Sequence, residues 1–304
     1  MDEEQNKMRV SFLGVRGSYP VPGKATLRYG GNTTCNVVEA GGHTIIVDAG
    51  TGIISLGIEL VNRHLKTKEP ICATLLFTHV HHDHTFGFMF FKPVYFQSTI
   101  ISILGPKTFA GDIYQELRDL LVSPYHPVAL DEMPMLATFG NLMGGEVLRF
   151  RPGAQNPQLM CSSTGADPDD LVVKVCANPN HTKLGVLHYR FEYRGRIYVF
   201  ATDVEAREKG EPTLCEFASG AHLIAHDAQY TDEDYYRGNP PKKGWGHSTV
   251  KMAVKTAQIT GAEKLALIHH DPEREDDALD VIEKDAKKLF PGAFLAREGM
   301  VVEV

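Results

Sequence analysis

The chain has 304 residues, of which 43% are hydrophobic and 23% charged, and its formal net charge is −7. This composition excludes a mainly disordered chain, and the acidic balance argues against a broad basic face for DNA or extended RNA. A chain of this length buries enough surface for a large core, so we expect one domain over residues 1–304.

The first half of the chain alternates short apolar runs with glycine-rich corners, which is typical of strands. We expect strands at 8–13, 36–39, 44–48 and 73–77. Apolar residues at helical spacing predict helices over 51–65 and 109–122. The stretch 151–170 has three prolines and little periodicity, so we expect a surface loop there.

Strand and helix patterns alternate in the second half. The expected strands are 171–176, 186–193, 196–201, 223–226 and 265–268, and the expected helices are 248–260 and 275–289. Arg194 and Gly195 separate two of the strands and predict a hairpin. Strands first, then alternating strands and helices, indicate an α/β fold in which sheets pack between helices.

A cluster of histidines follows the strand expected at 73–77. Four histidines and one aspartate fall within residues 79–84. Imidazole nitrogens and carboxylate oxygens are standard ligands of zinc-like ions, so a bound cation explains the cluster better than a solvated loop. His79 and His81 alternate along extended chain and share one side, whereas Asp83 and His84 follow the turn and face a second ion.

The pattern His79-x-His81-x-Asp83-His84 after an apolar strand resembles the signature of the metallo-β-lactamase superfamily. The resemblance implies a four-layer αββα sandwich with two metals at the edge of its sheets. The remaining positions of the family pattern are matched, in chain order, by Asp48, His181, Asp203 and His269.

The resemblance also implies a role for each of these residues. One metal is held by His79, His81 and His181, the other by Asp83, His84 and His269, and Asp203 bridges the two. Asp48 fixes the loop and does not bind metal. His82 and His270 point the other way and are not ligands. The implied cofactors are two divalent ions, zinc first, with manganese and iron as alternatives.

The segment His226-Asp-Ala-Gln229, followed by Gly246-His247-Ser-Thr249, favours a phosphodiester substrate. It resembles paired loops of tRNA 3′-processing endonucleases and phosphoribosyl cyclic phosphate phosphodiesterases. The resemblance makes Asp227 the support of His247, which protonates the leaving oxygen. Asp227 stands where the tRNA enzymes carry the longer Glu.

Two further features favour a phosphodiester. His247 directly precedes the helix expected at 248–260, whose free amide groups would attract anionic oxygens. The glycine-rich stretches 12–20 and 28–35 resemble the opening of the same phosphodiesterases, which makes Asn32 a candidate substrate contact. Trp245, in the loop before His247, is a second candidate, able to stack on one ring of the substrate.

We therefore expect a dinuclear-metal phosphodiesterase that hydrolyses a small phosphodiester, a cyclic nucleotide or ribose cyclic phosphate, by a metal-bridging hydroxide. A lactonase or thioesterase would share the metal ligands but has no need of the pair formed by Asp227 and His247. A tRNA 3′-processing endonuclease would also share them, and a non-catalytic, metal-stabilised binding module would need the ligands alone. The resemblance leaves a homodimer open.

Cysteine spacing and the chain start bear on location. The five cysteines are scattered and never spaced as a metal knuckle, which suits a reducing compartment. The N-terminus is polar without an apolar leader, and every apolar run is shorter than a membrane span. We expect a cytoplasmic protein without a membrane partner.

Overall fold

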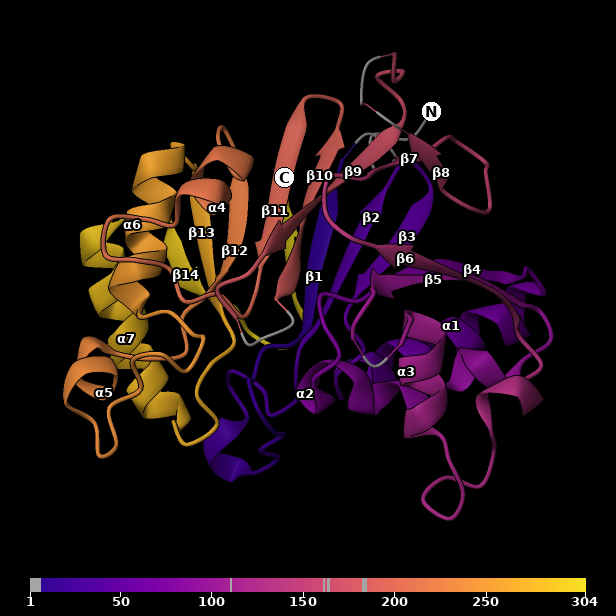
Figure 1. Cartoon of the computed structure of the whole chain (residues 1–304), viewed down its shortest axis with the longest axis horizontal. Coiled ribbons are helices and arrows are strands. Elements are labelled where there is room, and N and C mark those ends of the chain that lie inside the picture. The colour runs from indigo at the N-terminus through magenta and orange to yellow at the C-terminus, as the bar shows by residue number, and fades with distance from the viewer. Residues whose placement is uncertain (1–6, 110, 161, 163–164, 182–184) are drawn as a thin grey trace.

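The computed structural model describes residues 7–109, 111–160, 162, 165–181 and 185–304. Within these residues the strands form two sheets that lie between two groups of helices (Figure 1). The strand order is β15-β1-β2-β3-β4-β5-β6 in the first sheet and β14-β13-β12-β11-β10-β9-β7-β8 in the second. The expected αββα sandwich is confirmed.

The first sheet consists of β1 (Arg9–Gly14), β2 (Cys35–Ala40), β3 (His43–Val47), β4 (Ile71–Leu76), β5 (Thr99–Pro106), β6 (Leu136–Leu142) and β15 (Met300–Glu303). The second sheet consists of β7 (Val147–Phe150), β8 (Gln158–Met160), β9 (Leu171–Asn178), β10 (Val186–Tyr193), β11 (Arg196–Ala201), β12 (Leu223–Asp227), β13 (Lys264–Ile268) and β14 (Ala293–Leu295). The α-helices are α1 (Ile53–Thr67), α2 (His82–Thr85), α3 (Ile113–Leu120), α4 (Pro212–Phe217), α5 (Asp232–Arg237), α6 (Val250–Thr260) and α7 (Asp276–Leu289).

Three apolar layers join the four structural layers. Alternating residues of both sheets, such as Phe12 and Phe191, meet in one core between the sheets. Helices α1 and α3 cover the outer face of the first sheet, where Leu60 and Leu117 are buried. Helices α6 and α7 cover the second sheet, with Ala253 among the buried residues. Each helix thus buries one apolar stripe against a sheet.

Parallel pairing brings several strand ends to one edge of the sandwich. β3, β4 and β5 run parallel in the first sheet, and β11, β12 and β13 run parallel in the second. Tyr189 on β10 donates a hydrogen bond to the carbonyl of Phe77 (2.6 Å), and the amide of Leu187 donates to the carbonyl of Thr78 (2.9 Å). The two sheets are therefore tied together directly before the histidine cluster.

The hairpin predicted at Arg194 and Gly195 is confirmed. β10 pairs antiparallel with β11, and both turn residues have positive φ, 48° and 76°. Two consecutive positive φ values fit the twist of a two-residue hairpin.

Several elements differ from the expectation. Helix α3 is shorter than 109–122, because Asp112 caps its start by accepting from the amide of Gln115. Helix α6 begins at Val250 rather than 248, capped by Thr249. The stretch 151–170 contains the edge strand β8, which pairs with β7. β5 and β6 are not among the predicted strands; β5 is a nearly continuous apolar run, which hides the alternation of a half-buried strand.

The thiols of Cys35, Cys72, Cys176 and Cys215 are free, and Cys161 lies outside the described residues. In the part of the chain that the structure describes, no helix has the length and apolar character needed to span a membrane.

Candidate metal centre and active site

Two groups of histidine and aspartate donors meet at the edge where the parallel strands end. The first group contains His79, His81, His181 and Asp203, whose donor atoms all lie within 4.8 Å of one another. Nε2 of His181 is 3.4 Å from Nδ1 of His81 and 3.5 Å from Oδ2 of Asp203. His79 is buried, and its Nε2, 3.7 Å from the same carboxylate oxygen, has no hydrogen-bond partner among the described residues.

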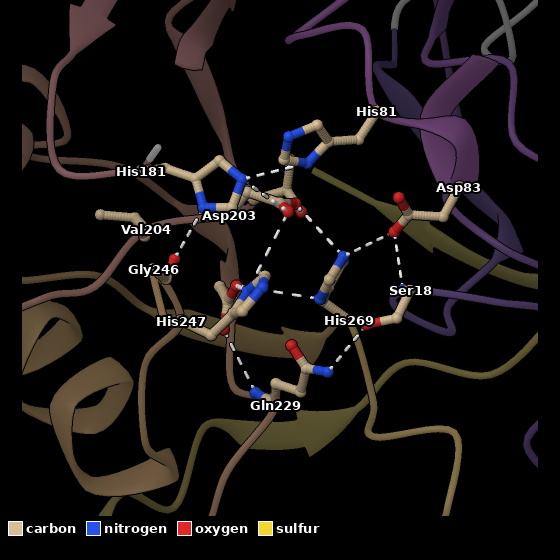
Figure 2. A network of polar contacts seen from close by, with 12 residues as sticks. Ser18, His81, Asp83, His181, Asp203, Val204, Gln229, Gly246, His247 and His269 are labelled. Atoms are coloured by element: carbon tan, nitrogen blue, oxygen red, sulfur yellow. Dashed lines mark hydrogen bonds and ion pairs between the residues drawn. The ribbon is translucent and has the colours of Figure 1, made fainter. Parts of the chain in front are cut away.

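The second group contains Asp83, His84 and His269, all buried. Nε2 of His84 lies 3.4 Å from Nε2 of His269 and 3.3 Å from Oδ2 of Asp83. Oδ1 of Asp203 lies 3.2 Å from His84 and 3.3 Å from His269. Asp203 therefore turns one oxygen toward each group, and Figure 2 shows its carboxylate between the two.

The spacing of these donor atoms suits zinc-like ions. A tetrahedral zinc ion with bonds of about 2.0–2.1 Å separates its ligand atoms by about 3.3–3.4 Å. The separations among His84, His269, Asp83 and Asp203 run from 3.2 to 3.4 Å. The unpartnered Nε2 of buried His79 also calls for a ligand, because a buried polar atom without a partner is costly. The residues present therefore fit divalent metal.

Electrostatics within the cluster favour added positive charge. Burial opposes the charged form of Asp203, but His269 and His84 outweigh it and hold the pKa of Asp203 well below its usual range. Burial likewise opposes a charged His269, yet Asp203 and Asp83 raise the pKa of His269 to about 9. Burial and the neighbouring His181 lower the pKa of His81 to about 4. Buried carboxylates that stay ionised need nearby cations, which metal ions supply.

Asp48 lies behind the second donor group. Its buried carboxylate accepts from Nδ1 of His84 (2.8 Å) and from the amide (2.8 Å) and hydroxyl of Thr78. The same hydroxyl is 3.0 Å from Nδ1 of His79. Asp48 thereby fixes the orientation of one imidazole directly and of a second through Thr78.

Three of these side chains turn into the site through a left-handed backbone. Asp48, Asp203 and His269 have φ of 63°, 51° and 60°, and each follows the end of a parallel strand, β3, β11 and β13. Residues with a side chain adopt this conformation at a cost of about 1–3 kcal/mol. The turn redirects the chain at the sheet edge and points the three side chains inward.

His247 and Asp227 form an ion pair beside the second group. Nδ1 of His247 lies 2.7 Å from Oδ2 of Asp227, whose other oxygen accepts from the amides of Ser248 (3.1 Å) and Gln229 (3.2 Å). The His247 ring stacks on that of His269 at 4.8 Å. Asp227 is thus held by two amides and pairs with His247, while the acid role expected of His247 stays a prediction.

The family of the chain follows from a comparison with family models. The model for the β-lactamase superfamily domain matches residues 43–270, which is well over half of the chain. The chain belongs to this superfamily. The resemblance to the metallo-β-lactamase superfamily is thereby confirmed, and membership of this superfamily together with the two donor groups implies binding of divalent metal.

Similar proteins of the superfamily include ribonucleases Z. One from Brevibacillus brevis is 33% identical over 106 residues, which cover 34% of this chain and 31% of the relative. One from Thermoplasma volcanium is 22% identical over 98% of both chains. Among solved structures, the metallo-β-lactamase fold protein YhfI from Bacillus subtilis has a TM-score of 0.65 at 18% identity, covering 98% of this chain and 100% of that one. The first of these matches spans under a third of its relative.

The amides at the start of α6 bear on the expectation that this helix end attracts anionic oxygens. The amides at the start of α6 are engaged inside the protein: Ser248 donates to Asp227, Val250 to the carbonyl of Tyr230, and Met252 to Thr249. Three amides at this helix start thus have partners inside the protein, and the attraction of anionic oxygens by this helix end stays a prediction.

Four other residues lie outside the donor groups. The carboxamide of Asn32 donates to Glu298 (2.6 Å), and its substrate role stays a prediction. Trp245 is half exposed, with the ammonium of Lys242 4.0 Å from its ring centroid. His270 is buried and bonds through Nε2 to the carbonyl of Ala296. Exposed His82 belongs to neither donor group.

Several residues that support the site are not predicted from the sequence. The amide of Ser18 donates to Oδ2 of Asp83 (2.7 Å). Gly17 packs against His269, since a Cβ there would lie 2.3 Å from the ring. Glu205 accepts from the amides of Gly244 (2.7 Å) and Gly246 (2.9 Å). Only the glycine spacing before Ser18 offers a signal in the sequence, because the other contacts join distant segments through backbone groups.

Proposed function

We propose that the chain is a metal-dependent hydrolase of small phosphodiesters. The observation that carries this proposal is the position of the His247–Asp227 pair, which stands against the second donor group and is held by its own hydrogen bonds. Metal ligands alone are compatible with ester, lactone and phosphodiester hydrolysis. A fixed acid beside them is needed when the leaving group is a poorly departing alkoxide.

The two donor groups would each bind one divalent ion. His79, His81 and His181 would hold one divalent ion, Asp83, His84 and His269 would hold the second, and Asp203 would contact both. When bound, such ions neutralise charge on phosphate oxygens and lower the pKa of water toward neutrality. Zinc fits the donor set, and so do manganese and iron.

His247 would deliver the proton to the leaving oxygen. Its Nδ1–H donates to Asp227, so the second ring nitrogen, Nε2, is the atom that faces substrate. The carboxylate keeps the hydrogen on Nδ1 and prevents the ring from turning. The ligand atoms of His247, Asp203 and His269 also lie within 4.8 Å of one another. Metal ligation by His247 is therefore the role that competes with proton donation.

A small substrate is proposed because charge on the chain does not suit a long nucleic acid. The formal net charge is −7, whereas a protein that binds several phosphates of folded RNA needs a basic stripe. Trp245 is half exposed in the loop that leads to His247, a position from which it would stack on one base or sugar of a cyclic nucleotide or ribose cyclic phosphate.

The first test is hydrolysis of bis(p-nitrophenyl) phosphate by purified protein whose metal content has been measured. We expect metal-dependent turnover that chelation removes and that His79→Ala loses together with part of the metal. Metal-loaded protein that leaves this ester intact but opens lactones or thioesters would refute the phosphodiesterase assignment in favour of that branch. Metal without hydrolysis of any ester would favour a non-catalytic binding module.

The acid assignment is tested by His247→Ala with two substrates of different leaving groups. We expect unchanged metal content and a loss of about 10²–10⁴-fold for an alkyl phosphodiester, because its alkoxide needs the proton. The loss for the activated nitrophenyl ester should be far smaller. Equal losses on both substrates, or departure of a metal ion, would show that His247 is not the acid.

A second candidate function is tRNA 3′-processing, favoured by the match to the Thermoplasma volcanium ribonuclease Z over 98% of both chains. Incubation with precursor tRNA that carries a 3′ trailer distinguishes the two substrates. Cleavage at the trailer with higher kcat/KM than any cyclic nucleotide would overturn the small-substrate proposal and keep the metal centre and His247 in place.

A further inference from the structure

The four buried imidazoles of the two donor groups are held from behind, with one exception. Nδ1 of His84 is 2.8 Å from Asp48, Nδ1 of His79 is 3.0 Å from the Thr78 hydroxyl, and Nδ1 of His181 is 3.0 Å from the carbonyl of Gly246. The exception is Nδ1 of buried His269, which has no hydrogen-bond partner among the described residues. The carboxylate oxygen Oδ2 of Asp227 is 3.9 Å from it, beyond hydrogen-bond distance.

Gln229 contains an unpartnered group of the opposite kind. The residue is only 5% exposed, and its Nε2 donates to the hydroxyl of Ser18 (3.2 Å). Its Oε1 is buried and accepts from no group that the structure describes. In Figure 2 this oxygen points toward the imidazoles of His247 and His269. A buried acceptor without a donor costs about 1–3 kcal/mol, so such an atom is expected to have a partner in the working protein.

The chemistry of ligation decides which partner it has. Nε2 of His269 faces Asp83, Asp203 and His84 at 3.2–3.4 Å, so this nitrogen is the one available to a metal. A neutral imidazole that ligates through Nε2 carries its single hydrogen on Nδ1 and needs an acceptor there. Of the two ring nitrogens of His269, the one left without a partner is therefore a donor.

We infer that Oε1 of Gln229 accepts the Nδ1–H of His269, directly or through one water molecule, and fixes the tautomer in which His269 ligates metal. Gln229 is then a positioning residue: it acts through the imidazole and not on the substrate. This inference rests on the metal-binding part of the proposed function and not on the identity of the substrate.

Gln229 also connects the metal ligands to the acid pair. Its backbone amide donates to Oδ1 of Asp227, the partner of His247. Its side chain holds Ser18, whose own amide donates to the carboxylate of Asp83. Loss of the carboxamide should therefore weaken metal binding at the second group first, since His269 and Asp83 both belong to it.

The experiment uses the full chain with zinc as the probe. Gln229→Met removes the amide and keeps much of the volume, and Gln229→Glu keeps an acceptor facing His269. The matched control is Gln258→Met, because Gln258 lies exposed on α6 and donates to the Leu289 carbonyl at 3.4 Å. Zinc affinity is measured by chelator competition, and imidazole N–H protons are followed by NMR of histidine labelled with ¹⁵N.

For Gln229→Met we expect a loss of about 10–100-fold in affinity for one of two zinc ions, with faster exchange of one buried imidazole N–H. Gln229→Glu should restore most of the affinity and the slow exchange, and Gln258→Met should match the unsubstituted chain. Circular dichroism verifies that each variant is folded, and the Glu variant carries the test if the Met variant is not.

Two results would overturn the inference: zinc affinity of Gln229→Met equal to that of Gln258→Met, or Gln229→Glu as weak as Gln229→Met. A protein that shows the expected pattern of zinc affinity but hydrolyses no phosphodiester would refute the proposed substrate class and leave the role of Gln229 intact.

Discussion

Substitution of Gly246 by alanine tests how closely the loop before His247 packs against the first donor group. A Cβ at Gly246 would lie 2.5 Å from Nδ1 of His181, and the φ of Gly246 is +87°. Gly244 in the same loop has φ +85°, but a Cβ there would meet nothing within 4 Å. Gly246→Ala and Gly244→Ala therefore carry the same backbone cost, about 1–2 kcal/mol for a left-handed residue, and differ only in the contact with His181.

The added methyl group of Gly246→Ala forces the His181 ring back by about 1 Å to reach an ordinary carbon contact of about 3.5 Å. Metal sites tolerate changes in ligand distance of only about 0.2 Å. We expect both variants to lose similar stability in urea, with the loss slightly larger for Gly246→Ala. Only Gly246→Ala should lose about 10–100-fold in affinity for the ion held by His79, His81 and His181, because His181 leaves its place.

Zinc affinity and stoichiometry, measured by competition with a chromophoric chelator, separate the two variants. One zinc ion should remain tightly bound in Gly246→Ala, since the second donor group does not include His181. Equal zinc affinities for the two alanine variants would refute the reasoning. So would loss of both ions from Gly244→Ala, which would mean that the backbone and not the imidazole contact governs the site.

Two predictions concern stability away from the metals. Burial opposes ionisation of Asp234, but hydrogen bonds from Thr231 and the charge of Arg274 outweigh the effect of burial and lower the pKa of Asp234. The ionised carboxylate therefore stabilises the fold at pH values above its unfolded pKa of about 3.9, and this stabilisation is lost as the pH falls through the folded pKa. Asp234→Asn should thus lower the free energy of unfolding at pH 7 and not at pH 2, as measured in urea. Arg16→Lys should destabilise by about 3 kcal/mol, because one ammonium cannot serve the carbonyls of Gly30, Asp271 and Arg274; a thermal midpoint equal to that of the unsubstituted chain would contradict this.

Sequence reasoning succeeds where chemistry is concentrated in adjacent residues. His79, His81, Asp83 and His84 lie within one turn and one strand end, so their spacing alone indicates a cation site. The family pattern then adds Asp203 by position. The structure brings all of these residues together, because the parallel strands that precede them end at one edge.

Sequence reasoning fails where a residue acts through backbone groups or through folding partners far along the chain. Ser18 supports Asp83 with an amide, which every residue but proline possesses. Glu205 reaches across about 40 positions to two glycine amides. Two amides at the start of α6 are bonded to Asp227 and Tyr230, and no local sequence pattern predicts these contacts.

The left-handed backbone at Asp48, Asp203 and His269 has a consequence for how this chain can evolve. Glycine would relieve the backbone strain at each position, but it would also remove a buried side chain of the donor cluster or of its hydrogen-bonded support. Selection for an unstrained backbone alone would therefore replace these side chains at the ends of the three strands. The presence of aspartate and histidine at these turns indicates selection for chemistry at the expense of stability.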